Sequence, residues 1–190
     1  MRCVVLLLDN SSDLVEHLGI VARCVSAALL LSHGIRKDAT FRLYLREEGL
    51  VASFEGSRLR GVRADEQSLG GIIRKIYREA MRGISRPRNV HYGVALARSG
   101  LDKMLRGAPG SRAYYVDHRR GIDLRRIELR GLRSVTFVLS MGETYTPAEL
   151  EVFKRRGLVP VRVSPARLYP ESLIVLLNNE LDRAEASWRS

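Results

Sequence analysis

Short runs of apolar residues alternate with longer amphipathic segments along the chain. A short, mostly apolar run of this kind predicts a strand that is buried on both faces of a sheet. Such runs occupy 3–8, 113–116, 135–139 and 159–163. Strands are therefore expected at both ends of the chain, and the segments between them decide the fold class.

The amphipathic segments carry the start and stop signals of helices. Asp13 and Glu16 have the spacing of a capping box, and Gly34 is typical of a helix end. Thr146, followed by proline and with Glu149 three residues on, marks another helix start. Helices are predicted over 13–32, 65–82, 99–105, 146–157 and 170–186.

Strands alternating with helices predict an α/β fold, in which a parallel sheet is covered by helices on both faces. The length fits a single domain over 1–190. A hairpin is expected for 41–45 with 50–54, whereas 84–97 is interpreted as a loop with a short strand. Ligands of such sheets bind beyond the carboxyl ends of the strands. The expected ligand site therefore lies in the loops after Val116, Leu139 and Val163.

Charge suggests the class of partner. Lys+Arg number 32 and Asp+Glu 21, so the net charge is +11, and 28 of the basic residues are arginines. The planar guanidinium group binds phosphate oxygens in pairs, which favours a nucleic-acid partner. A proteome that favours arginine in general would give the same excess. The arginines gather in three loops, at Arg58, Arg60 and Arg63, at Arg82, Arg86 and Arg88, and from Arg119 and Arg120 to Arg133.

Several classes of protein are not expected. The longest apolar runs have about five residues, whereas a membrane span needs about 20. The chain begins directly with a strand-like run rather than a signal peptide, which predicts a cytoplasmic protein with no membrane partner. Cys3, Cys24 and four scattered histidines lack metal-ligand spacing, so no metal is expected. Standard signatures such as GxSxG, GxGxxG and HExxH are absent.

Four segments match one family in order and spacing. They are Arg23-Cys24-Val25-Ser26 with Ser32-His33, Ile35-Arg36 and Asp38; Phe54, Gly56, Leu59, Val62 and Asp65-Glu66; Tyr114-Tyr115-Val116; and Val163-Ser164-Pro165, followed by Asn178 or Asn179 and Leu181-Asp182. Together they resemble the TrmY family, the archaeal tRNA pseudouridine N1-methyltransferases of the SPOUT superfamily. The likeness extends over nearly the whole chain.

The resemblance implies a SPOUT-type fold with a C-terminal trefoil knot, and a homodimer. It also implies the cofactor S-adenosylmethionine, bound by the three loops that the sheet rule selects, with 140–144 as the middle loop. The implied cofactor-binding residues are Val116, Leu139, Ser140, Gly142, Val163, Ser164, Pro165, Ala166, Arg167, Leu168 and Leu173. The substrate would be a pseudouridine in the T-loop of tRNA, at position 54.

Within the matched segments, Arg36 and Asp38 are the candidate catalytic residues, for oxyanion or RNA contact and for proton transfer. Arg23, Arg58, Arg60, Arg63, Arg119 and Arg120 are the candidate RNA-binding residues. The sequence departs from the family where Gly-Asp-His is usual, because Ser140-Met141-Gly142 stands there. Two alternatives therefore stay open: an RNA-binding homologue without methyltransferase activity, and a methyltransferase that acts on another RNA.

Overall fold

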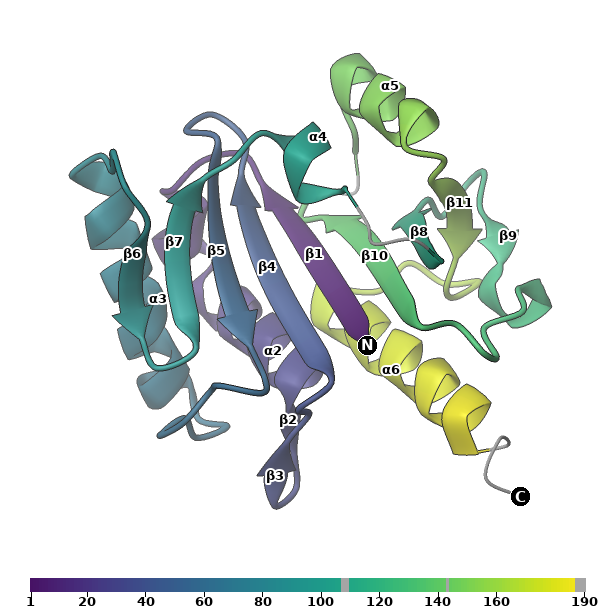
Figure 1. Cartoon of the computed structure of the whole chain (residues 1–190), viewed down its shortest axis with the longest axis horizontal. Coiled ribbons are helices and arrows are strands. Elements are labelled where there is room, and N and C mark those ends of the chain that lie inside the picture. Colours follow the sequence, from purple (N-terminus) through teal and green to yellow (C-terminus); the bar gives the residue numbers. More distant parts are fainter. Residues whose placement is uncertain (107–109, 143, 187–190) are drawn as a thin grey trace.

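The computed structural model describes residues 1–106, 110–142 and 144–186 (Figure 1). A nine-stranded sheet in the order β6-β7-β5-β4-β1-β10-β8-β11-β9 forms the centre of this part of the chain. Its strands are β1 (Arg2–Leu8), β4 (Ala39–Leu45), β5 (Leu50–Glu55), β6 (Arg88–His91), β7 (Val94–Arg98), β8 (Ser111–Val116), β9 (Ile122–Asp123), β10 (Ser134–Ser140) and β11 (Val159–Arg162). A separate hairpin joins β2 (Leu30–Leu31) to β3 (Gly34–Ile35).

Helices cover both faces of the sheet, as the sequence predicts. They are α1 (Asp13–Glu16), α2 (Leu18–Leu29), α3 (Glu66–Met81), α4 (Leu101–Met104), α5 (Pro147–Arg155) and α6 (Pro170–Ala186), with a 3-10 turn η1 (Leu124–Arg126). Figure 1 shows α2, α3 and α6 behind the sheet and α4 and α5 in front of it. Alternate side chains of β1 pack on opposite faces of the sheet. Val4 and Leu6 pack in the core under α2, α3 and α6, and Val5 and Leu7 pack in the core with Phe153 of α5.

The sheet is mixed: the expected parallel pairing is confirmed for most of it, and the remaining pairs are antiparallel. From β4 through β1, β10, β8 and β11 to β9 the strands are parallel. The pairs β4/β5, β5/β7 and β6/β7 are antiparallel. The hairpin expected for 41–45 and 50–54 is confirmed, with Leu45 opposite Leu50. The segment 84–97, interpreted as a loop with a short strand, instead forms most of the hairpin β6–β7 at the edge of the sheet.

The prediction of one helix over 13–32 was wrong in extent and capping. The segment forms two helices divided at His17, whose φ of −111° and ψ of 29° are not helical, and the second helix ends at Leu29. Leu30 is extended, so the chain turns into the β2–β3 hairpin and Gly34 lies in β3. Asp13 is the first residue of α1 and accepts a hydrogen bond from the Asp9 backbone N–H (2.7 Å). The helical spacing of apolar residues thus identified the buried face and not the break.

Other element boundaries follow the sequence closely. Asp65 caps α3 by accepting a hydrogen bond from the Ser68 backbone N–H (2.6 Å). The Thr146–Glu149 capping box is present at α5. The helix expected over 99–105 is shorter, since α4 begins after Gly100 and no side chain caps it. No helix in the described residues is long and apolar enough to span a bilayer.

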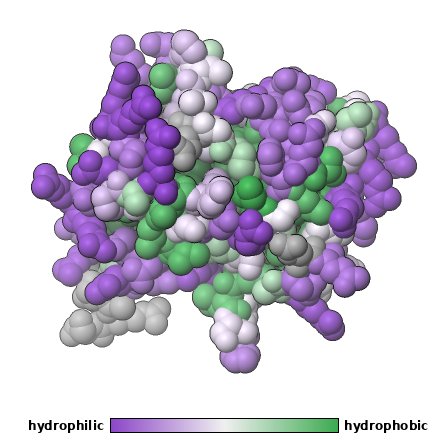
Figure 2. Space-filling view, turned by 180° about the vertical axis from the view of Figure 1, so that it is seen from behind, coloured by the Kyte–Doolittle hydropathy of each residue, from purple (hydrophilic) through white to green (hydrophobic). Residues whose placement is uncertain are grey.

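The face that carries α2, α3 and α6 is mostly polar at its periphery (Figure 2). Apolar residues gather toward the middle of this view and at the hairpin that projects from the molecule. Leu31 of β2 and Val175 of α6 are among the large apolar residues with about half of their surface exposed, 50% and 54% respectively. The fold therefore leaves part of this face apolar.

Candidate functional site

The carboxyl ends of β8, β10 and β11 meet at one cavity, as the sheet rule predicts. Leu173, in the first turns of α6, forms another wall of the cavity. The residues that line it include Val116, Leu139, Ser140, Val163, Ser164, Ala166, Arg167, Leu168 and Leu173, all named in advance from the sequence. His118 also lines it and was not predicted. Pro165 lies exposed in the same loop, and Gly142 lines a neighbouring cavity instead.

The cavity suits a weakly polar group. Its walls are mostly aliphatic, and they come from the ends of three strands, the loops that follow them and the start of α6. Small-molecule sites commonly combine apolar walls with a few fixed polar groups. The chemistry of the residues present therefore suits the adenosine part of S-adenosylmethionine, and the cavity of about 40 Å³ must widen to admit it.

Ser140, which stands where the resemblance places glycine, does not fill the cavity with its side chain. Successive side chains of a strand point to opposite faces, so Leu139 and Ser140 diverge. The Ser140 hydroxyl is buried on the α5 face and accepts a hydrogen bond from Arg46 Nη2 (3.1 Å). The departure from the family is thus accommodated by an arginine from the end of β4.

Arg46 connects several parts of the β10–α5 loop. Its Nε donates to the buried carboxylate of Glu149 (2.8 Å), and its Nη2 donates to the Thr144 carbonyl (3.1 Å). Its Nη1 pairs with Asp9 after β1 (2.6 Å). One side chain therefore joins the ends of β1, β4 and β10 to the first turn of α5.

Tyr145 holds the same loop from inside. Its hydroxyl lies within hydrogen-bond distance of the Val116 carbonyl (2.9 Å) and the Val138 carbonyl (3.1 Å). Its ring packs edge-on against Tyr115 and Phe153. Burial, followed by the nearby carboxylates of Asp117 and Glu149, raises the pKa of Tyr145 well above its ordinary value. The hydroxyl consequently remains a neutral donor that connects the ends of β8 and β10.

The loop from Asp117 to Gly121 is folded tightly onto β11. The Asp117 backbone N–H donates to the Val161 carbonyl (2.9 Å), and its carboxylate accepts from the backbone N–H groups of Arg119 and Arg120 (2.9 Å each). A Cβ on Gly121 would lie 2.2 Å from the carbonyl carbon of Val161. Only glycine fits this approach, and the loop that carries His118 depends on it.

A second, basic cavity adjoins the first on the α5 side. His118 and Arg167 line both cavities. Arg119 and Arg120 are exposed at the second cavity and form no ion pair with the described residues. Lys154 of α5 adds another cation. Of the predicted RNA-binding residues, Arg119 and Arg120 therefore lie beside the cavity at the carboxyl ends of β8, β10 and β11.

The other predicted RNA-binding residues lie elsewhere. Arg58 and Arg60 line a cavity at the β6–β7 edge, and Arg63 is exposed in the loop that leads to α3. Arg23 of α2 pairs with Glu171 of α6 (3.0 Å). The structure thus divides the six arginines among three regions of the surface.

Arg36 and Asp38, the predicted catalytic residues, lie at the opposite end of the sheet from the cavity. Asp38 pairs with Arg2 at the start of β1 (2.9 Å), and Arg36 forms two bonds to Asp182 of α6 (2.7 Å each). Asp182 also pairs with the buried Arg2 (2.7 Å). Although desolvation opposes it, hydrogen bonding to Arg36 and Arg2 lowers the pKa of Asp182. The strand β10 spans about 20 Å between its ends, so one chain does not bring this network to its own cavity.

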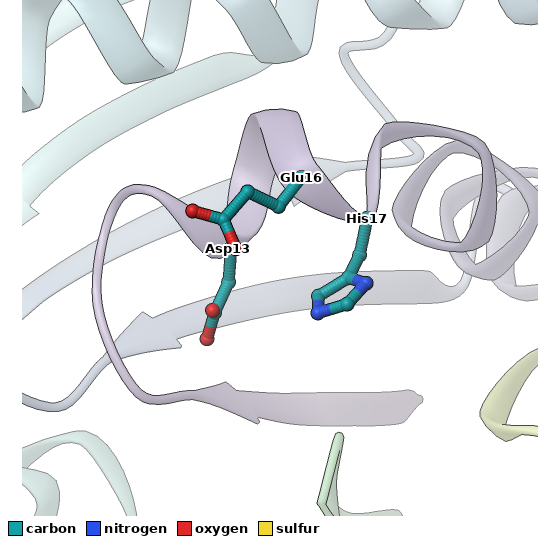
Figure 3. Close-up of side chains that lie close together, drawn as sticks. All are labelled: Asp13, Glu16 and His17. Atoms are coloured by element: carbon teal, nitrogen blue, oxygen red, sulfur yellow. The ribbon is translucent and has the colours of Figure 1, made fainter.

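Asp13, Glu16 and His17 form a group around one helical turn (Figure 3). Their ligand atoms lie within 4.8 Å of one another. Glu16 and His17 are exposed, and the carboxylate of Asp13 already accepts the Asp9 backbone N–H. Nothing else in the structure points to an ion there, and the expectation of no metal stays a prediction.

Replacing Ser140 by alanine separates the role of its hydroxyl from that of the cavity. Ser140→Ala removes the bond to Arg46 and should lower the free energy of unfolding by about 1 kcal/mol, as measured by urea denaturation. The affinity for S-adenosylmethionine should stay within about twofold, because the side chain points away from the cavity. A tenfold loss of affinity with unchanged stability would contradict this orientation.

A family model described as "Putative SAM-dependent RNA methyltransferase" matches residues 6–186. The chain belongs to this family. Among the curated proteins similar to it, a tRNA (pseudouridine(54)-N(1))-methyltransferase of Methanosarcina acetivorans is 34% identical over 170 residues, which cover 88% of this chain and 79% of that protein. Its counterpart in Haloferax volcanii is 32% identical over 178 residues, 93% of this chain and 88% of that protein.

Among solved structures, Archaeoglobus fulgidus Nep1 bound to S-adenosylhomocysteine has a similar fold, with a TM-score of 0.65. The alignment covers 97% of this chain and 99% of that one at 12% identity. The likeness therefore shows the fold. It confirms that this member of the RNA methyltransferase family has the α/β architecture expected from its sequence.

Sequence reasoning missed several residues that build the site in this family member. Arg46, Tyr145 and Gly121 act through partners far away in the chain or through backbone contacts, and no local pattern marks them. His118 could have been found, because it lies two residues beyond Val116 in a loop that the sheet rule selects.

Proposed function

We propose that this protein transfers a methyl group from S-adenosylmethionine to N1 of a pseudouridine in the T-loop of tRNA, at position 54. The observation that carries the proposal is the cavity at the carboxyl ends of β8, β10 and β11, in a chain of the RNA methyltransferase family. The names of relatives at 34% and 32% identity support the choice of base and RNA.

The cofactor would lie against Leu139, Val163, Leu168 and Leu173, with backbone groups of the three loops toward its polar atoms. When bound, S-adenosylmethionine supplies an electrophilic methyl carbon attached to a sulfonium sulfur. The aliphatic walls keep water from the site. Arg46 and Tyr145 fix the β10–α5 loop, so this part of the site needs little further ordering when the ligand binds.

The basic cavity would receive the RNA. Arg119, Arg120 and Lys154 provide cations for phosphate groups beside the cofactor cavity. A base must leave its stack to reach such a cavity, and a loop nucleotide does so at the lowest cost. Holding the base near the reacting carbon is the main catalytic contribution expected of the chain, because N1 of pseudouridine is a weak nucleophile while it is protonated.

Several finer features belong to the same proposal. A trefoil knot is supported by the family resemblance alone. A homodimer is supported by the apolar residues exposed on that face, among them Leu31 and Val175. A cytoplasmic location follows from a tRNA substrate.

A catalytic role for Arg36 and Asp38 would require a second copy of the chain. Both residues lie at the amino ends of the parallel strands, away from the cavity of their own chain. In a homodimer they would act at the partner's cavity. Within one chain, their ion pairs with Arg2 and Asp182 attach α6 to the sheet.

Calorimetric titration with S-adenosylmethionine tests the site first. The wild-type protein should bind the cofactor in the micromolar range and then methylate tRNA that carries pseudouridine 54. Leu173→Trp, which fills the cavity, should weaken binding at least tenfold, whereas Asn179→Trp on the exposed surface of the same helix should not. Absence of binding at millimolar cofactor, with tRNA still bound, would leave an RNA-binding protein without this activity. Cofactor binding with methylation of a different RNA would identify a methyltransferase that acts on another RNA.

A further inference from the structure

The turn between β6 and β7 presents an aromatic ring to solvent at the edge of the sheet. Tyr92 has 76% of its surface exposed, more than the other large apolar or aromatic residues of the described chain. It lies in the β6–β7 turn, which Figure 1 shows at the lower left, and it lines a cavity that Arg58, Arg60 and His91 also line. An exposed aromatic ring among cations is the usual composition of a platform for single-stranded nucleic acid.

The hairpin tip is held rigidly against the loop that carries the arginines. His91 Nε2 lies 2.8 Å from the Arg60 carbonyl, and the Glu55 backbone N–H donates to the Gly93 carbonyl (2.8 Å). Gly93 has a φ of +75°, and a Cβ there would lie 2.6 Å from the Leu59 backbone nitrogen. The two segments therefore form one unit, and Tyr92 is positioned without the entropic cost of ordering a mobile loop.

The charges around Tyr92 are available to a ligand. The Arg58 side chain is 75% exposed, and its Nη1 lies 3.5 Å from Glu55 Oε2, which is a long ion pair. The Arg60 side chain makes no ion pair with the described residues. His91 packs edge-on to the Tyr92 ring, with the ring centroids 6.3 Å apart. Guanidinium groups beside the same cavity as an aromatic ring match a nucleotide, whose base stacks on the ring while its phosphates pair with the cations.

The platform is separate from the cofactor cavity. Five strand spacings lie between β7 and β8, about 24 Å, and the β6–β7 turn is at the opposite end of the strands from the cavity. The diagonal separation is about 30 Å. A nucleotide on Tyr92 is consequently a different one from the base that enters the cavity of the same chain.

We propose that Tyr92, with Arg58 and Arg60, binds an unpaired nucleotide of the tRNA substrate at a distance from the base that the same chain would methylate. The inference rests on the proposed function for the identity of the RNA. Stacking requires an unpaired base, so the contact falls on a loop or on a single-stranded end rather than on a duplex stem.

The test measures the affinity of the whole protein for full-length tRNA by fluorescence anisotropy over a range of salt concentrations. Tyr92→Ala should weaken binding about five- to a hundredfold, and Tyr92→Phe, which keeps the ring, should stay within about twofold. The double variant Arg58→Ala/Arg60→Ala should reduce the slope of log affinity against log salt by about 1.5, whereas Tyr92→Ala should leave the slope unchanged. Methylation by Tyr92→Ala at saturating tRNA should keep the wild-type kcat, because the ring is remote from the cavity.

The outcomes for the platform and for the proposed function are distinct. Wild-type affinity in Tyr92→Ala, in a protein that methylates tRNA, would overturn the platform alone. Weakened tRNA binding in Tyr92→Ala, with no methylation by the wild type, would support the platform and overturn the proposed function. A wild-type protein that does not bind tRNA would overturn both.

Discussion

Gly121→Ala should lower the free energy of unfolding by about 3 kcal/mol or more and weaken S-adenosylmethionine binding at least tenfold. The added methyl group would lie 2.2 Å from the Val161 carbonyl carbon, 2.4 Å from the Arg162 backbone nitrogen and 2.5 Å from the Asp117 carbonyl oxygen. All three are backbone atoms, so no rotamer change relieves the contact. Either the loop before β9 or β11 itself must move, and both border the cavity. Urea denaturation and calorimetric titration measure the two effects.

A matched substitution controls for the general effect of replacing glycine. Gly71 lies in α3, and a Cβ there would meet nothing within 4 Å. Gly71→Ala should therefore raise the free energy of unfolding by up to about 1 kcal/mol, because alanine is the better helix former. Opposite signs for the two variants would locate the effect at the β8–β9 loop. A Gly121→Ala protein with wild-type stability would show that the loop relaxes freely.

The sequence predicted those parts of the site that depend on local rules. Thr146 and Glu149 form the expected capping box because both partners lie within one turn. The meeting of the three loops at the cavity follows from the parallel direction of β8, β10 and β11, since parallel strands place their carboxyl ends at one edge. These features needed no knowledge of distant contacts.

The parts that sequence reasoning did not predict depend on contacts between distant residues. The break at His17 and the turn at Leu30 interrupt a segment whose apolar spacing is helical throughout, so only packing against the rest of the fold decides its ends. The hairpin β6–β7 pairs with β5, which lies more than thirty residues earlier in the chain. Register of that kind is set by the partner strand, and the short sequence of β6 does not indicate it.

The departure at Ser140 illustrates why a motif alone does not decide a pocket. In the linear sequence, a serine in place of glycine suggests a blocked or altered cavity. In the fold, the strand directs that side chain to the other face, where Arg46 binds it. The consequence of the substitution thus depends on a residue 94 positions away.

Arg46→Met should lower the free energy of unfolding by about 2–4 kcal/mol and weaken S-adenosylmethionine binding several-fold. The change keeps the bulk of the side chain and removes its charge. It leaves the Glu149 carboxylate, whose side chain is only 8% exposed, without its cation, and a buried charge that has lost its partner is costly. It also releases Thr144 and Ser140, so the β10–α5 loop loses its outer attachment. Denaturation and cofactor titration measure the two losses.

A double variant decides whether the ion pair is the cause. Glu149→Gln removes the carboxylate but can still accept the Thr146 backbone N–H, which preserves the capping box. Arg46→Met/Glu149→Gln should therefore be more stable than Arg46→Met alone, and the full cycle with Glu149→Gln should give a coupling energy of about 1–3 kcal/mol between the two residues. Arg98→Met, which removes an exposed arginine bonded to the Glu48 carbonyl, should cost less than about 1 kcal/mol. If the double variant recovers stability without recovering cofactor affinity, the bonds from Arg46 to Ser140 and Thr144 position the cavity wall, and the pair with Glu149 serves the fold alone.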